Sequence, residues 1–185
     1  MKEVSEVCSD LKQVADDAKA TFGSLSAEQL NWKPGENEWS VAQCFDHLIV
    51  THSLYFEECE KVSTSGYNPT FWQKFSPLSG FFGRFLIKRL DPKNPNKMKT
   101  MGKAVPSASG IDGDIIGRFV EHQRQMVETV QRFPTDLDLE NTIVTSPLLG
   151  FVTYSLADTL TFLPMHCRRH FDQAQRVVDT EGFLK

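Results

Sequence analysis

Residues 163–178 read LPMHCRRHFDQAQRVV, and this stretch sets His166 and His170 four positions apart. On an α-helix that spacing places both rings on one face, one turn apart. Apolar residues share this face, so both imidazoles are expected to point toward a core; they are Leu156, Leu160, Leu163, Ala174 and Val177. Two converging neutral imidazoles favour half of a transition-metal site, whereas the alternative interpretation is a pair of packed core histidines.

Three further segments repeat their apolar residues with the same helical period. They are residues 3–22, 40–62 and 111–133. Each places apolar side chains at i, i+3, i+4 and i+7, as in an amphipathic helix. Ser40 and Gln43 form a capping box at the start of the second segment, and Ser155 caps the last helix. Four long helices with little strand predict an all-α fold, a four-helix bundle.

Residues 63–109 interrupt this pattern with five prolines and form a long crossover segment between the second and third helices. One amphipathic piece, SGFFGRFLIKRL at residues 79–90, lies inside the crossover. Between Arg84 and Lys103, seven basic residues accompany a single acid, Asp91. We weigh three interpretations of this basic stretch: a solvated crossover, a lid or anion-attracting rim beside a pocket, and a helix lying on a membrane.

Length and composition narrow the class of protein. The 185 residues predict a single domain, residues 1–185. A net charge of −4 argues against nucleic-acid binding, and no apolar run approaches the roughly 20 residues that cross a bilayer. The polar N-terminus does not resemble a signal peptide. Four cysteines without a C-x2-C pair predict reduced thiols in a cytoplasmic protein.

The second helix offers two histidines that could join the pair on the last helix. Its apolar centre line passes through His52, which periodicity therefore makes the more inward of the two. His47 lies on the flank, near Cys44, from where it could still reach a seam between helices. Periodicity alone leaves this choice open. On the third helix, His122 faces inward, either as a packed histidine or as a residue behind the metal ligands.

Two motifs together resemble the DinB/YfiT-like superfamily: EWSVAQCFDHL at residues 38–48 and HCRRHFDQAQRV at residues 166–177. Members of this family carry a tryptophan just before the second helix, a histidine with an aliphatic neighbour on that helix, and H-x2-R-H-x2-Q on the last helix. The matching residues are Trp39, Ser40, His47, Leu48, His166, Arg169, His170 and Gln173. The resemblance spans the four helices and is weakest over residues 63–109.

The resemblance implies a four-helix bundle in which three histidines bind a divalent metal, here His47, His166 and His170. It thus favours His47 over His52. Zinc and nickel are the first candidates, with iron, manganese and cobalt as alternatives. Some family members transfer a low-molecular-weight thiol such as bacillithiol, mycothiol or glutathione, and others are maleylpyruvate isomerases. The family takes its name from a DNA-damage-inducible gene, which suggests a stress response and implies no contact with DNA.

The functional hypotheses follow from three imidazoles with open coordination positions, the layout of a catalytic metal site. The first is a metal-dependent transferase that activates a small thiol for attack on an electrophile. The alternatives are a metal-dependent hydrolase, a non-catalytic metal- or ligand-binding module, and a structural homodimer with packed histidines. A small thiol and an electrophile are the expected partners, with neither nucleic acid nor membrane.

Several neighbouring residues carry secondary predictions. Cys44 is a candidate fourth ligand, whereas Cys167 is expected to point elsewhere as a small buried residue. Gln173 is expected to accept a hydrogen bond from a ligand histidine, and Arg169 to contact an anion or an acid. No general base is singled out; the candidates are His52, His122 and Glu121.

Overall fold

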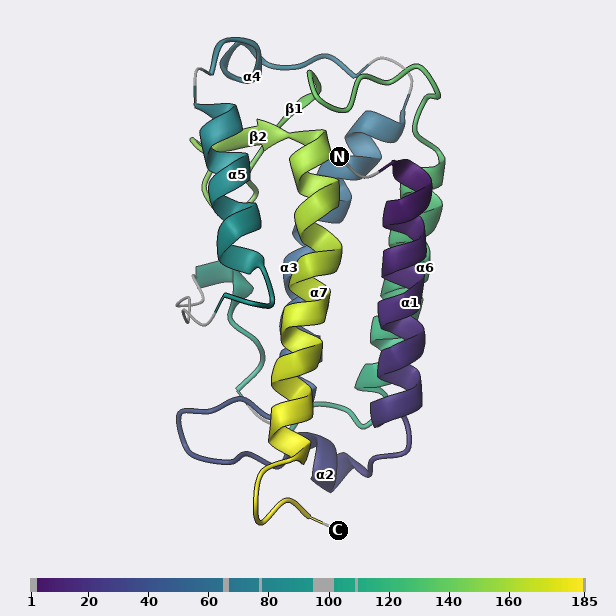
Figure 1. Cartoon of the computed structure of the whole chain (residues 1–185), viewed down its shortest axis with the longest axis vertical. Helices are drawn as coiled ribbons and strands as arrows, with labels where there is room; N and C mark the ends of the chain where they lie inside the picture. Colours follow the sequence, from purple (N-terminus) through teal and green to yellow (C-terminus); the bar gives the residue numbers. More distant parts are fainter. Residues whose placement is uncertain (1–2, 65–66, 77, 95–101, 109, 185) are drawn as a thin grey trace.

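Four long helices lie side by side in the computed structural model, which describes residues 3–64, 67–76, 78–94, 102–108 and 110–184 (Figure 1). They are α1 (Val4–Phe22), α3 (Val41–Ser63), α6 (Ile115–Gln131) and α7 (Leu156–Val178). α1 packs against α6 and α7, and α3 packs against the same two helices. The predicted all-α class is confirmed, since the described strands form only one short pair.

The helices begin where side-chain caps can take up their first amides. At α3, the Ser40 hydroxyl accepts from the Gln43 amide and the Gln43 side chain accepts from the Ser40 amide, each at 3.1 Å. Ser155 caps α7, as predicted: its hydroxyl accepts from the Asp158 amide at 3.0 Å. The predicted start of the third helix at residue 111 is wrong, because α6 begins at Ile115. The Asp112 carboxylate accepts the Asp114 amide at 3.0 Å, which holds a turn before the helix.

Aromatic rings join the four helices in the core. Phe45 of α3 lies 5.4 Å from Phe22 of α1 and 4.9 Å from Phe119 of α6, measured between ring centroids. All three side chains are fully buried, and each such burial contributes about 1.5–3 kcal/mol to folding. The predicted inner face of α7 is buried as well, which orients its two histidines toward the other helices.

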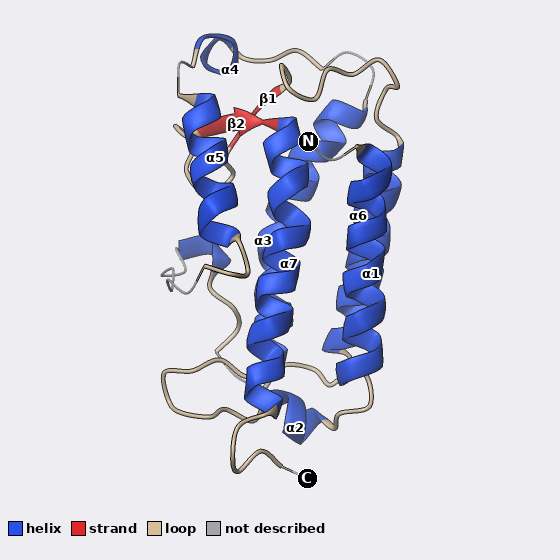
Figure 2. Ribbon diagram, viewed as in Figure 1, coloured by secondary structure: helices blue, strands red, loops and turns tan. Residues whose placement is uncertain are grey.

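The remaining elements lie at the ends and on one side of the long helices (Figure 2). They are α2 (Ala27–Asn31), α4 (Phe71–Phe75), α5 (Ser79–Leu90), the short 3-10 helix η1 (Gly102–Ala104), and the antiparallel strands β1 (Ile143–Thr145) and β2 (Thr153–Ser155). The predicted amphipathic piece of the crossover is therefore a helix, α5, which packs against α7 and β2. Gly83 permits this contact, because a Cβ there would lie 2.0 Å from Asp158 Oδ2.

The outward face of α5 combines aromatic and basic side chains. Phe81 and Phe85 are about half exposed or more, and Arg84 and Lys88 are exposed beside them. Lys97 and Lys99 of the basic stretch lie outside the described residues, as does the side chain of Lys103. Within the described part of the chain, no helix has both the length and the apolar content that a membrane span requires.

Candidate metal centre

Three histidines from two helices meet at one point. His166 Nε2 lies 3.3 Å from His47 Nε2 and 3.1 Å from His170 Nε2. We call these three residues the histidine triad; each is buried, with 5–8% of its surface exposed. The triad forms a group that can hold a metal ion. The structure thus brings together the three residues that the sequence motifs indicated.

The packing of α3 against α7 creates this meeting point. The i, i+4 spacing of His166 and His170 stacks their rings on one face of α7, with centroids 4.7 Å apart. The flank of α3 brings His47 against the same face, 4.6 Å from the His170 ring. Trp39, just before α3, stacks on His170 at 5.6 Å and lies 5.0 Å from His47. Its indole therefore forms a wall of the site.

Backbone and side-chain oxygens determine the tautomers of the two outer histidines. His47 Nδ1 lies 2.5 Å from the carbonyl oxygen of Ala104, and His170 Nδ1 lies 3.1 Å from Gln173 Oε1. Both oxygens are acceptors, so each Nδ1 carries the proton and donates it. The Nε2 lone pairs of His47 and His170 are consequently free and directed at the same point. Acceptors of this kind behind the ring are typical of metal-binding histidines.

Burial keeps the triad neutral near pH 7. Desolvation lowers the pKa of His47 and lowers the pKa values of His166 and His170 well below the usual range. The remaining histidines and Arg169 add to the effect, because a positive charge nearby disfavours another. A neutral imidazole is the form that binds a metal, so the environment prepares all three rings for ligation.

The spacing of the nitrogens also fits a metal ion. Zinc binds imidazole nitrogen at about 2.0–2.1 Å, so a tetrahedral ion separates its ligand nitrogens by about 3.4 Å. The two Nε2 distances to His166 are close to this value. Without a cation, lone pairs that face one another at such distances repel. The donor set and its geometry therefore suit a divalent transition metal with three protein ligands.

Neither Cys44 nor Cys167 joins the three histidines. Cys44 is buried but does not belong to the triad's group, and burial raises its pKa. Cys167 points away from the triad, as predicted, and contacts His52 and Gln123.

Gln173 accepts from His170, which confirms the prediction for its amide oxygen. Arg169 donates to the carbonyl oxygens of Asp91 and Asn94, contacts that the sequence did not suggest.

The candidate general bases separate into different environments. His52 is fully buried, and its Nε2 lies 3.2 Å from His166 Nδ1, so it lies behind the triad. His122 lies at the edge of the core, where it is half-buried and its ring is 6.4 Å from that of His52, whereas the neighbouring Gln123 is fully buried. Glu121 is exposed and pairs with Arg124.

Two features of the site were missed from the sequence alone. The Ala104 carbonyl is a backbone group in an irregular segment, and no side-chain pattern indicates where such a group lies. Trp39 is one of the residues that match the family motif, but the sequence does not indicate that its ring contacts two of the histidines. The position of a conspicuous tryptophan one residue before the α3 cap was the available signal.

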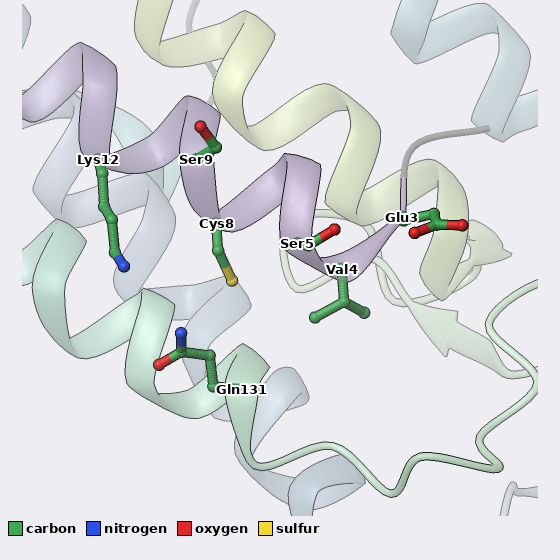
Figure 3. Close-up of a pocket in the computed structure, with 7 residues that line it drawn as sticks. All are labelled: Glu3, Val4, Ser5, Cys8, Ser9, Lys12 and Gln131. Carbon is green, nitrogen blue, oxygen red and sulfur yellow. The ribbon is translucent and has the colours of Figure 1, made fainter.

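Surface pockets elsewhere do not involve the triad. One lies between the start of α1 and Gln131 of α6 and is lined by Cys8, Ser9 and Lys12 among others (Figure 3). Another lies near Tyr67, between the end of α3 and Thr145. Neither is lined by a histidine, so the metal centre is the better candidate for the functional site.

Comparison with known proteins identifies the family. Searches of curated proteins and of solved structures returned no match. The sequence profile described as the DinB superfamily matches residues 10–174, a range that includes the triad, Trp39 and the whole of the crossover. The match spans most of the chain, and the chain belongs to the DinB superfamily.

Proposed function

We propose that this protein is a single-domain four-helix bundle that binds a divalent metal through His47, His166 and His170 and transfers a small thiol to an electrophile. The convergence of three buried Nε2 atoms, two of them with their protons held on Nδ1, carries the proposal. Three protein ligands leave coordination positions for substrate, as in catalytic rather than structural sites. When bound, the ion supplies Lewis acidity that lowers the pKa of a thiol.

The surroundings of the triad support a thiol that comes from outside the protein. All four cysteines are buried, and burial raises the pKa values of Cys44 and Cys167 nearest the triad. Buried neutral thiols are poor nucleophiles. In the proposed reaction the sulfur of a small thiol forms a bond to carbon of the electrophile, whose leaving group departs, while the thiol proton passes to solvent. Trp39 provides an apolar wall that limits water beside the triad.

Metal-loaded protein, purified without a polyhistidine tag, would be tested for conjugation of bacillithiol, mycothiol, glutathione and cysteine to monochlorobimane. We expect conjugation above the uncatalysed rate with at least one thiol, and none with His166→Ala/His170→Ala. Metal content would be measured on both proteins. A metal-loaded wild type with no conjugation beyond background would contradict the transferase proposal.

The second candidate is a non-catalytic metal-binding module, which the low exposure of the triad favours. Only 5–8% of the surface of each of the three residues is exposed, and Ala104 and Trp39 lie directly against the triad. A module of this kind binds one metal per chain and is stabilised by it without turning over any thiol. The same experiment separates the two candidates, because both require metal and only the transferase requires conjugation.

A further inference from the structure

Behind the triad lies a buried histidine that does not belong to it. His52 is fully buried on α3, and its Nε2 lies 3.2 Å from His166 Nδ1. His166 is the central member of the triad, within 3.3 Å of both other Nε2 atoms. Its partner is another imidazole, which can either donate or accept a proton. The tautomer of His166 therefore depends on what lies beyond His52.

A chain of hydrogen bonds continues from His52 into α6. The Cys167 sulfur lies 3.8 Å from His52 Nδ1 and 3.7 Å from Gln123 Oε1. Gln123 Nε2 lies 3.4 Å from His122 Nδ1, and His122 Nε2 lies 3.1 Å from the Ser53 hydroxyl. His52, Cys167 and Gln123 have no exposed surface, so each must satisfy its polar atoms within this chain.

The far end of the chain determines its direction. The Ser53 hydroxyl lies 2.7 Å from the carbonyl oxygen of Ile49, which only accepts, so the hydroxyl proton is used there. Ser53 can then only accept from His122, which places the proton of the neutral His122 ring on Nε2. His122 Nδ1 is left as an acceptor, and the side-chain amide of Gln123 donates to it.

The same reasoning carries the direction to the triad. Because Gln123 Nε2 donates to His122, Gln123 Oε1 faces Cys167 and accepts a hydrogen bond from its thiol. The Cys167 sulfur then accepts from His52 Nδ1, which leaves His52 Nε2 as an acceptor. His166 must therefore donate from Nδ1, and its Nε2 lone pair faces the other two histidines. All three Nε2 atoms then present lone pairs to one point.

We propose that His52, supported by Cys167 and Gln123, is a positioning residue that holds the proton of His166 on Nδ1 so that Nε2 can bind the metal. This inference rests on the proposed metal site. His47 and His170 obtain the same tautomer from oxygen acceptors. His166 obtains it from a relay that joins α3, α7 and α6, so its ligating form depends on the correct packing of three helices.

The test compares two substitutions of His52 that differ in one property. His52→Gln keeps an acceptor near the position of Nε2, whereas His52→Leu has similar bulk and no acceptor. We expect His52→Leu to weaken zinc binding about 10-fold to 100-fold, the usual effect of losing a partner behind a metal-binding histidine. His52→Gln should bind zinc nearly as well as the wild type. Affinity would be measured by competition with a chromophoric chelator.

Control variants distinguish a loss of zinc affinity caused by a less stable fold from one caused by a changed tautomer of His166. Met126→Ala opens a cavity in the same region of α6 without removing a hydrogen bond, and it should reduce thermal stability while zinc affinity stays unchanged. If His52→Leu does not fold, Cys167→Ala and Cys167→Ser provide the equivalent pair. Equal losses in the Gln and Leu variants, or wild-type affinity in a folded Leu variant, would overturn the proposal.

Nitrogen-15 NMR of the imidazoles supplies a readout that does not depend on zinc binding or activity. In the wild-type protein, metal-free and zinc-loaded, we expect His52 to carry its proton on Nδ1 and His122 on Nε2. If the wild-type protein takes up no zinc, the proposed function is wrong, but the tautomers still test the chain of hydrogen bonds. The proton of His52 found on Nε2 would overturn the inference itself.

Discussion

The candidate metal centre has two halves that are built differently. The helical half consists of side chains at periodic positions on α3 and α7, which supply the triad. The crossover half consists of backbone carbonyls: Ala104 accepts from His47, while Asp91 and Asn94 accept from Arg169. The helical half specifies which atoms can bind a metal, and the crossover half covers them and orients a ring. Ligand chemistry and ligand orientation are thus encoded in different parts of the chain.

Buried polar side chains of α3 hold the two halves together. The Asp46 carboxylate accepts from the Ser107 amide at 2.7 Å, and the Gln43 side chain donates to the carbonyls of Ser107 and Ala108. These bonds fix the chain directly after η1, which carries the Ala104 carbonyl. The comparison therefore makes a general prediction: damage to the helical half removes the metal, whereas damage to the crossover half changes stability and the rate of metal release.

Acid should damage the helical half most. All five histidines lie on α3, α6 and α7, and burial lowers every one of their pKa values. As the pH falls, the histidines of the unfolded chain take up protons near pH 6.5, before those of the folded metal-free protein do. The free energy of unfolding is therefore highest above that pH and decreases below it. Each histidine that stays neutral in the fold contributes about 2 kcal/mol to the loss between pH 7 and 5.

Burial lowers the pKa values of His52, His166 and His170 well below the usual range, so these three histidines are expected to account for most of the loss in the metal-free protein. Urea unfolding at pH 7.5, 6 and 5 would measure it. His52→Gln should make the dependence shallower by about 2 kcal/mol. A free energy of unfolding that does not change with pH would show that the histidines are not buried as described.

Removal of one ligand should abolish tight metal binding while the crossover half stays in place. His47→Ala is expected to weaken zinc binding more than about 100-fold, beyond the effect of residues that lie behind ligands. Thr51→Val is the matched control, because Thr51 Oγ1 lies 3.3 Å from His47 Nδ1 on the far side from the triad's centre. Chelator competition on both variants makes the measurement, and comparable affinities would refute the assignment of His47.

Loss of Arg169 should loosen the crossover half without removing a ligand. Its guanidinium donates to two carbonyls, and a hydrogen bond from a charged group contributes about 1.5–3 kcal/mol. Arg169→Ala should therefore lower the free energy of unfolding by about that amount and speed zinc release to a chelator. Arg169→Lys should fall between, because an ammonium lacks the planar fork. If Arg169→Ala unfolds faster but releases zinc at the wild-type rate, the crossover half does not control metal release.

The neighbouring arginine provides the smallest expected effect. Arg168 pairs with Asp17 of α1 at 2.7 Å, and about a third of each side chain is exposed. Such pairs are screened by solvent, so Arg168→Ala should cost less than about 1 kcal/mol and leave zinc release unchanged. Stopped-flow release from this variant and from Arg169→Ala, side by side, sharpens the contrast. Equal acceleration in both would mean that general destabilisation controls release.

The helical half could be predicted from the sequence to a large extent. Periodicity located all four long helices, the capping box located the start of α3, and the Ser155 cap located the start of α7. The choice of His47 over His52 came from family motifs. Helical periodicity shows which side chain faces the core, but it does not show which flank of α3 packs against α7. His52 proved to be the more buried of the two, as periodicity indicated, and it lies behind the triad.

The crossover half could not be predicted, for a physical reason. A carbonyl oxygen exists at every residue, so the position of Ala104 depends on the path of the chain and not on its side chain. The same limit applies to the bonds that Arg169 donates to the carbonyls of Asp91 and Asn94, whereas the sequence predicts a contact with an anion or an acid. The three interpretations of the basic stretch remain predictions, since part of it lies outside the described residues.

The distance in sequence between the ligands has a consequence for folding. His47 and His166 are 119 positions apart, whereas His166 and His170 are separated by one helical turn. An unfolded chain retains the close pair but must close a long loop to recruit the third ligand, which costs entropy. An ion bound by all three therefore favours the native state over every open one, by an amount that grows with its free concentration. The free energy of unfolding would then rise with the concentration of free metal.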